Sequence, residues 1–232
     1  MTTVNTKNKK PLVVGICGLI GSGKDTAADY LVNFHEFRRA SFAGILKDAV
    51  SSVFGWDREL LEGRTKESRE WREQVDPWWA ARLNMPELTP RWVLQQWGTE
   101  VCRRAFHDDI WIAGLENKLR NTTDNVVISD CRFPNEIQAI RNQGGTIVQI
   151  QRGVLPHWYD IAVQANRGVE SAQRFLAAEG IHASETSWIG ERFDHCVDNN
   201  RGLDHLYGQI KSLVLDPQAS KATDSGALPA GN

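Results

Sequence analysis

A glycine-rich loop near the N-terminus constrains the fold of this chain more than any other feature. The sequence Gly18-Leu-Ile-Gly-Ser-Gly-Lys-Asp-Thr26 follows an apolar run, Leu12–Cys17, and opens a helical pattern, Asp25–Phe34. A strand, such a loop and a helix form a phosphate-binding loop, or P-loop. Its glycines let backbone N–H groups curl around phosphate oxygens, and the helix N-terminus adds partial positive charge. The sequence therefore predicts a loop that holds nucleotide phosphates, with Lys24 on the outer two.

The residues after the P-loop lysine narrow the class of protein. A lysine followed directly by Ser or Thr normally places that hydroxyl on magnesium. Here Asp25 follows Lys24, and the hydroxyl comes one position later, at Thr26. This order resembles nucleoside monophosphate kinases. Neither the N-K-x-D motif of guanine-binding proteins nor an LSGGQ-like signature occurs, so signalling GTPases and transport ATPases are disfavoured.

Apolar or β-branched runs alternate with helical patterns along the chain. The expected strands are Leu12–Cys17, Phe37–Phe42, Val126–Asp130, Thr146–Gln151 and His195–Asn199. The expected helices are Asp25–Phe34, Ala43–Phe54, Pro90–Phe106, Asp109–Leu119, Asn135–Asn142 and Leu203–Leu215. Strands that alternate with helices are typical of a parallel, doubly wound sheet. We expect a three-layer α/β P-loop fold with a mostly parallel five-stranded sheet.

Two long stretches, Trp56–Thr89 and Gly153–Arg192, do not fit this alternation, and both are rich in Arg and Trp. Long insertions in such folds usually carry binding lids. The predicted domain spans residues 11–215, with helical insertions at about 56–106 and 153–192. Residues 1–10 are expected to form a flexible arm. Residues 216–232, rich in Ala, Ser, Gly and Pro, are expected to form a disordered tail.

Composition excludes several classes of protein. The formal net charge of −2 argues against a protein that coats duplex DNA. No apolar run reaches the roughly 20 residues of a membrane helix, and the polar N-terminus does not resemble a signal peptide. The four cysteines show no C-x-x-C spacing and indicate reduced thiols in the cytoplasm. Arginine outnumbers lysine, and this excess indicates either anionic small ligands or salt bridges on the surface. Composition alone does not distinguish the two, so the motifs must.

A second motif follows the apolar run Val126–Asp130, where Asp130 is predicted to lie at the carboxyl end of a strand. Ligands of α/β folds bind at that edge. Asp130 could therefore hold magnesium through water or contact a nucleotide, and Arg132 could bind a phosphate. Glu136 lies on the first turn of the next helix. The alternative is that Asp130 and Glu136 cap helices while Arg132 pairs with one of them.

A third motif covers 91–104. On a helix, Arg91, Gln95 and Gly98 share one face, with Thr99 and Arg103 near it. Glycine in a helix interior costs about 1 kcal/mol relative to alanine, which suggests close approach by a ligand or another backbone at Gly98. Such a polar stripe could read a base edge and bind its phosphate. A solvated face with a packing glycine is equally compatible.

Further arginines lie in the two insertions. Arg64, Arg69 and Arg72 precede a Trp78-Trp79 pair, which predicts either a nucleotide clamp or a helix with structural tryptophans. In the second insertion, Arg152, Arg167 and Arg174 could act on a transferring phosphoryl group. His182 is expected to be structural. No Ser-His-Asp triad or His and Cys metal cluster is indicated.

Together these motifs resemble the deoxynucleoside monophosphate kinases of tailed bacteriophages. The resemblance rests on G-x-x-G-S-G-K-D-T at 18–26, R-x-x-L-Q-x-x-G-T-E at 91–100 and D-x-R-F-P-N-E at 130–136. H-A-S-E at 182–185 and D-x-x-V-D-N at 194–199 add to it. The resemblance covers residues 12–215 and implies a P-loop kinase core with an acceptor-binding insertion and a lid.

The resemblance also implies roles for single residues. ATP phosphates would be held by Gly21, Ser22, Gly23, Lys24, Asp25 and Thr26. The acceptor, a deoxynucleoside monophosphate, would be bound by Ile20, Arg64, Arg91, Gln95, Gly98, Thr99, Arg103, Trp111, Asp130, Arg132 and Glu136. Lys24, Arg132 and Arg152 would be catalytic. Mg²⁺ would be held by Thr26 and by Asp130, through water.

The expected reaction moves the γ-phosphoryl group of ATP onto a dNMP, giving dNDP and ADP for DNA synthesis. Three alternatives stay open: another small-molecule P-loop kinase resembling dephospho-CoA kinase, a nucleic-acid-dependent P-loop ATPase, and a non-catalytic nucleotide-binding protein. The expected partners are small nucleotides, with no stable nucleic acid and no membrane. A homodimer is plausible, and the expected compartment is the cytoplasm, the host's if a phage encodes the chain.

Overall fold

The computed structural model describes residues 11–215, so the arm predicted at 1–10 and the tail predicted at 216–232 lie outside the described residues. The chain divides into two compact units. The first contains the described residues up to Arg39 and from Thr122 onward, and the second is Ala40–Asn121.

The first unit is built on a five-stranded sheet in the order β2-β3-β1-β4-β5. The strands are β1 (Val13–Cys17), β2 (Phe37–Ala40), β3 (Asn125–Ile128), β4 (Thr146–Gln151) and β5 (His195–Asp198). β1 is central and pairs in parallel with β3 and β4, and β4 pairs in parallel with β5. Nearly continuous apolar sequence suits strands covered on both faces. The predicted α/β fold and parallel sheet are confirmed.

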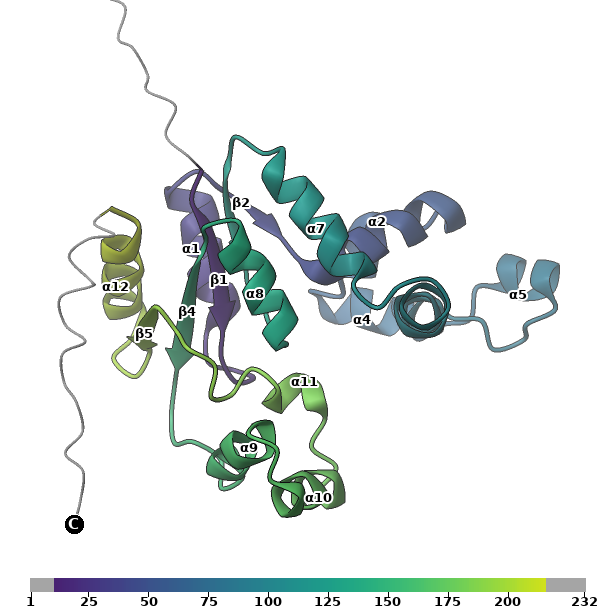
Figure 1. Ribbon diagram of the computed structural model, residues 1–232. Helices are drawn as coiled ribbons and strands as arrows, with labels where there is room; N and C mark the ends of the chain where they lie inside the picture. Colours follow the sequence, from purple (N-terminus) through teal and green to yellow (C-terminus); the bar gives the residue numbers. More distant parts are fainter. Residues whose placement is uncertain (1–10, 216–232) are drawn as a thin grey trace, which may run out of the picture. The chain divides into compact units, whose positions relative to one another are not determined.

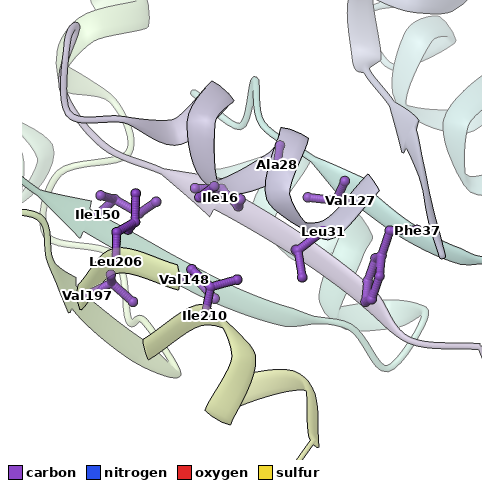
Figure 2. Packing of buried hydrophobic residues seen from close by; sticks show 11 residues of the cluster. Ile16, Ala28, Leu31, Phe37, Val127, Val148, Ile150, Val197, Leu206 and Ile210 are labelled. Atoms are coloured by element: carbon purple, nitrogen blue, oxygen red, sulfur yellow. The ribbon is translucent and has the colours of Figure 1, made fainter. Parts of the chain in front are cut away.

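Helices cover both faces of this sheet, which gives the three layers. α1 (Lys24–Phe34) and α12 (Leu203–Leu215) contact one face, and α8 (Pro134–Asn142) contacts the other; Figure 1 shows α1 and α8 on opposite sides of β1. Figure 2 shows the core beneath α1 and α12. Its buried residues are Ile16, Ala27, Ala28, Leu31, Phe37, Val127, Val148, Ile150, Val197, Leu206 and Ile210.

On the α8 face, the sheet leaves no space for a side chain at Gly15. A Cβ there would lie 2.7 Å from Ile140 Cδ1, 2.9 Å from Ile147 Cδ1 and 3.2 Å from Cys131 Sγ. Cys131, which is part of this contact, and Cys17, two residues after Gly15, are both buried. Burial raises the pKa of the Cys131 thiol well above its ordinary value, and the neighbouring Cys17 thiol adds to that effect.

The stretch predicted as a lid forms three short helices, α9 (Tyr159–Asn166), α10 (Glu170–Ala178) and α11 (Ala183–Thr186). The Asn166 amide fastens the end of this segment by donating to Thr186 O at 2.8 Å and to Ile189 O at 2.7 Å. Trp188 is buried, and its ring meets that of Tyr159 on α9 in an edge-to-face arrangement.

The second unit is helical: α2 (Phe42–Phe54), α3 (Arg58–Glu62), α4 (Lys66–Arg72), α5 (Pro77–Leu83), α6 (Pro90–Gln95), the π-helix η1 (Gln96–Arg104) and α7 (Ile110–Arg120). The short helices are capped by their own sequence, since Asp57, Thr65, Asp76 and Thr89 each accept backbone N–H bonds at a helix start. Thr89 and Pro90 begin α6 as predicted.

Tryptophans form much of the core of the second unit. Trp56 is buried, stacks on Phe54 and donates to Asp76 Oδ2 at 2.8 Å. Trp79 donates to Phe54 O at 3.0 Å. Trp78, by contrast, is 62% exposed. Most of the aromatic side chains in this stretch therefore support the fold of the unit itself.

One predicted helix is wrong in kind. Pro90–Phe106 is not a single α-helix, because α6 ends at Gln95 and the chain continues as η1. In a π-helix the N–H of a residue bonds five positions back, which widens the turn. Gly98 lies within this stretch, its carbonyl accepts the Trp111 indole N–H at 2.9 Å, and a Cβ at Gly98 would lie 2.9 Å from Leu46 Cδ2. The close approach at Gly98 is made by side chains of the same unit.

Candidate active site

The P-loop adopts a backbone that its glycines permit. Gly21 has φ 77° and Gly23 has φ 99°, both in the left-handed region that favours glycine. Gly23 is the N-cap of α1, so the loop passes directly into the helix. At Gly18, a Cβ would lie 2.5 Å from Ile150 O. The loop therefore presents backbone at the carboxyl edge of the sheet, where a phosphate can be held by N–H groups.

A buried asparagine from the far end of the chain holds this loop. Asn199, just after β5, donates through Nδ2 to Ser22 O at 2.8 Å. Its amide also occupies the space that a Cβ at Gly23 would need. Ser22 is 2% exposed, and its hydroxyl has no hydrogen-bond partner among residues 11–215. Asn199 was not predicted as a site residue, although it ends the 194–199 motif.

Lys24 lies folded over the loop. Its ammonium donates to Gly18 O at 2.8 Å and to Leu19 O at 2.7 Å. Burial lowers the Lys24 pKa, with the positive charge of Arg132 acting in the same direction, while Asp25 and Glu185 oppose the shift. The ammonium is thus partly desolvated and bonded to carbonyls that a phosphate can replace.

The first turn of α1 is joined to two other elements. The Asp25 carboxylate accepts from Arg39 Nη1 at 2.9 Å and from the Ser129 hydroxyl at 3.0 Å. Thr26 follows, half-buried. Ile20, predicted to touch the acceptor, is 79% exposed at the tip of the loop. Neither Arg39 nor Ser129 was predicted from the sequence.

The loop after β3 is shaped by Glu136. This carboxylate is 5% exposed, and its Oε2 accepts from the backbone N–H of Arg132 at 2.8 Å and of Phe133 at 3.1 Å. Glu136 therefore caps α8, which confirms the part of the capping interpretation that concerned this residue, while Arg132 pairs with Glu185. Asp130 lies half-buried in this loop, two residues beyond the end of β3.

Arg132 contacts the lid segment. Its Nη1 lies 3.4 Å from both Glu185 Oε1 and Ser184 Oγ on α11. His182 caps α11 by accepting from Ser184 N at 3.2 Å, the structural role predicted for it. Because Arg132 and Glu185 both act on the Lys24 pKa, the first unit brings these three charges together. Glu185 and Ser184 belong to the H-A-S-E motif but were not predicted as site residues.

The predicted lid arginines have few partners. Arg152 is exposed just after β4, and no bond joins its side chain to another described residue. Arg174 pairs with Glu170 on its own helix at 3.4 Å. The structure therefore places Arg132, rather than Arg152, in the charge cluster around Lys24.

The remaining predicted acceptor residues belong to the second unit. Arg91 pairs with Glu73 at 3.0 Å and lowers the pKa of Arg72, whose burial is the larger cause. Gln95, Thr99 and Arg64 are exposed, and Arg103 is half-buried. Trp111 is 8% exposed and holds Gly98 from below through its indole N–H. Trp111 is thus a buried side chain that supports the backbone of η1, and it is not an exposed residue of that segment.

Among the described residues, no group of three or more His, Cys, Asp or Glu side chains could hold a metal ion. The P-loop offers the Thr26 hydroxyl and the loop after β3 offers the Asp130 carboxylate, both hard oxygen donors. Mg²⁺ usually keeps several waters and binds through one or two protein oxygens together with substrate phosphates. The donor set fits a magnesium ion that arrives with a nucleotide. Residues 11–215 contain no helix of the length and apolarity needed to cross a membrane.

Comparison with known proteins gives two viral relatives. A protein of Acanthamoeba polyphaga mimivirus, provisionally named a deoxynucleotide monophosphate kinase, is 29% identical over 218 residues, which is 88% of this chain and 96% of that protein. The deoxynucleoside-5'-monophosphate kinase of Escherichia phage T5 is 28% identical over 179 residues, covering 56% of this chain and 72% of the relative. The resemblance predicted from the motifs is confirmed. The chain is a phosphotransferase.

No model of a known protein family matches the chain. Among solved structures, a Thermus thermophilus protein aligns with a TM-score of 0.40 and 17% identity, covering 89% of this chain and 97% of the other. A dephospho-CoA kinase from Campylobacter jejuni aligns with the same TM-score and coverage at 13% identity.

Proposed function

We propose that this phosphotransferase moves the γ-phosphoryl group of ATP onto a deoxynucleoside 5'-monophosphate, giving dNDP and ADP. The observation that carries the proposal is the charge cluster of the first unit, where Lys24, over a glycine-shaped P-loop, is joined by Arg132. The similarity to two viral kinases supports the choice of acceptor. The acceptor's own phosphate is a nucleophile at neutral pH, so the site needs no strong general base.

In this proposal, the backbone of Gly21–Lys24 binds the ATP phosphates, and Lys24 exchanges its bonds to Gly18 O and Leu19 O for bonds to phosphate oxygens. Asp25 and Thr26 start the helix that faces these phosphates. Arg132 compensates the charge that develops on the transferring group. Glu136 contributes by fixing the backbone of Arg132. Arg152, exposed directly after β4, is assigned the same charge-compensating role once a nucleotide is bound.

Mg²⁺ bound with ATP would neutralise phosphate charge, and Thr26 and Asp130 would hold it directly or through water. Arg64, Arg91, Gln95, Thr99 and Arg103 would bind the acceptor through its phosphate and base. Gly98 would offer its backbone, and Ile20 would line the acceptor side of the loop. Trp111 would act from beneath, by holding Gly98.

The decisive experiment is a panel assay. Purified protein, ATP and Mg²⁺ are mixed with each dNMP, each NMP, dephospho-CoA or single-stranded DNA, and the products are separated by chromatography. ADP together with dNDP, for some dNMPs only, is the expected result. Phosphorylated dephospho-CoA, or ATP hydrolysis stimulated by DNA without a phosphorylated acceptor, would replace the proposal with the corresponding alternative.

A Lys24→Met variant serves as the control in the same panel. It should lose turnover with every acceptor while keeping its fold. ADP formation that survives unchanged in this variant would come from a contaminating kinase or from a site other than the P-loop.

A further inference from the structure

Arg39, on β2, makes more bonds to the first turns of α1 than any other side chain of the described chain. Its Nη1 donates to Asp25 Oδ1 at 2.9 Å, and its Nη2 donates to Asp25 O at 3.0 Å and to Asp29 Oδ1 at 2.9 Å. A planar guanidinium with several donors suits this fork-like arrangement, whereas a lysine ammonium does not reproduce it.

Ser129 completes the arrangement from the end of β3. Its hydroxyl accepts from Arg39 Nη1 at 3.3 Å and donates to Asp25 Oδ1 at 3.0 Å. Two donors therefore converge on one oxygen of the Asp25 carboxylate. The other oxygen, Oδ2, accepts no hydrogen bond from another residue in 11–215.

The side chains of this cluster differ in exposure: Arg39, which supports the carboxylate, is largely covered, and Asp25 is open to solvent. The Arg39 side chain is 19% exposed, whereas the Asp25 side chain is 79% exposed. Asp25 follows the P-loop lysine directly in the sequence, and the bonds from Arg39 and Ser129 hold its carboxylate by Oδ1. A carboxylate pinned by one oxygen and open at the other is oriented for a ligand that prefers oxygen donors.

Charge gives Arg39 a second task. Asp25 and Asp29 lie one helical turn apart, and like charges at this spacing repel each other. The Arg39 guanidinium bonds to both and offsets their charge. Without it, the two carboxylates would also repel the phosphates of a nucleotide at the adjacent loop.

We propose that Arg39 is a positioning residue: with Ser129, it fixes the Asp25 carboxylate so that Oδ2 is presented to the Mg²⁺ ion that accompanies ATP. The inference rests on the proposed function only in requiring Mg·ATP as a ligand, and it needs no particular acceptor. It adds Asp25 to the magnesium-facing groups and gives an edge-strand arginine an indirect role in nucleotide binding.

The test measures nucleotide affinity by calorimetry, with no acceptor present, for ATP in excess Mg²⁺ and for ATP in EDTA. Arg39→Lys keeps the positive charge and loses the fork. We expect it to weaken Mg·ATP binding about tenfold, the lower end of what outer-shell partners of metal ligands contribute, while ATP in EDTA binds nearly as before. Ser129→Ala, which removes one of the two donors, should show the same pattern at smaller amplitude.

The neighbouring arginine provides a matched control. Arg38 lies on the same strand and pairs with Asp124 at 2.7 Å, and its side chain is 76% exposed. Arg38→Lys should leave both affinities unchanged. In an Asp25→Asn background, Arg39→Lys should have no further effect on Mg·ATP, because the group that it positions is already altered.

Several results would overturn the inference. They are equal weakening of ATP with and without Mg²⁺, a full Arg39→Lys effect in the Asp25→Asn background, or a wild type that binds ATP equally in Mg²⁺ and EDTA. A wild type that binds Mg·ATP as expected but phosphorylates no dNMP would sink the proposed function alone. Circular dichroism and thermal unfolding establish that each variant is folded.

Discussion

The P-loop and the Gln96–Arg104 segment carry the two ends of the proposed reaction and are supported in opposite ways. The P-loop is bonded to residues far along the chain, with Asn199 on Ser22 and Ser129 on Asp25. The polar side chains of Gln96–Arg104 bond locally, as in the pair of Arg104 with Glu100, or to no other described residue, as with Thr99. A loop that binds by its backbone must be shaped before the ligand arrives, whereas exposed side chains can be ordered by the ligand at an entropic cost.

The largest expected effect belongs to the P-loop. Lys24→Met should lower kcat by about 10²–10³-fold, because it removes a charge contact made most strongly in the transition state. Steady-state kinetics with a dNMP acceptor measures this. A kcat within a few fold of wild type would show that the charge cluster around Lys24 is not the catalytic centre.

Next in size is the effect of an exposed arginine of the second unit. Arg91→Ala should raise the KM for the dNMP by about 10–100-fold, the equivalent of one lost bond to a charged group, and leave the KM for ATP unchanged. Its stability should barely change, because the pair with Glu73 is exposed. A rise in the KM for ATP instead would assign Arg91 to the donor.

The distant bond that holds the P-loop and the local pair in Gln96–Arg104 should contribute differently to the stability of the protein. Asn199→Ala should lower the free energy of unfolding by about 1–3 kcal/mol, since Ser22 O stays buried without its donor. Arg104→Ala, which breaks an exposed pair, should change it by less than about 0.5 kcal/mol. Denaturant unfolding of both variants makes the comparison, and equal losses would show that the distant bond from Asn199 stabilises the protein no more than the local pair of Arg104 with Glu100 does.

A smaller effect is expected where the second unit does use a longer-range bond. Trp111→Phe keeps most of the buried ring and removes the donor to Gly98 O, so it should cost about 1 kcal/mol of stability. Because Gly98 is part of η1, losing this bond should also raise the KM for the dNMP, while the KM for ATP stays constant. Loss of stability without any change in KM would separate the shape of η1 from acceptor binding.

The smallest effect concerns pH. Because burial lowers the Lys24 pKa, the charged lysine disfavours the folded state below that pKa. In the window between the lowered pKa and the ordinary one, the unfolded chain binds more protons than the folded chain, so stability rises with pH. Lys24→Met should therefore be more stable than wild type at pH 7, with a gap that narrows toward about pH 10. Urea unfolding at both pH values measures the gap, and one that widens with pH would contradict the burial argument.

The sheet and its helices were predictable because their patterns are local. β4 has the bounds that the apolar run indicated, and β1, β5 and α1 differ from their predicted bounds by one residue at one end. The P-loop was predictable for the same reason, since its glycines are contiguous and each allows a backbone form closed to other residues.

The parts that escaped prediction depend on contacts between distant positions. Arg39 looks like a solvated residue of an edge strand until Asp25 and Ser129 are brought beside it. Asn199 lies in a motif that was noticed, but nothing local shows that its amide reaches Ser22. Leu46 and Trp111 approach Gly98 within η1 from distant positions, and the periodicity of 90–106 carries no trace of either.

The two buried thiols on the α8 face of the sheet can report, through their rate of alkylation, how often this part of the protein opens. Cys17 directly precedes the P-loop, and Cys131 directly follows Asp130. Both thiols are buried, and burial raises the pKa of Cys131. An alkylating reagent can reach them only when this part of the sheet opens, whereas Cys196 is exposed. The lag between fast and slow alkylation therefore times the opening of the layer beneath the P-loop, and a nucleotide that tightens the loop lengthens that lag.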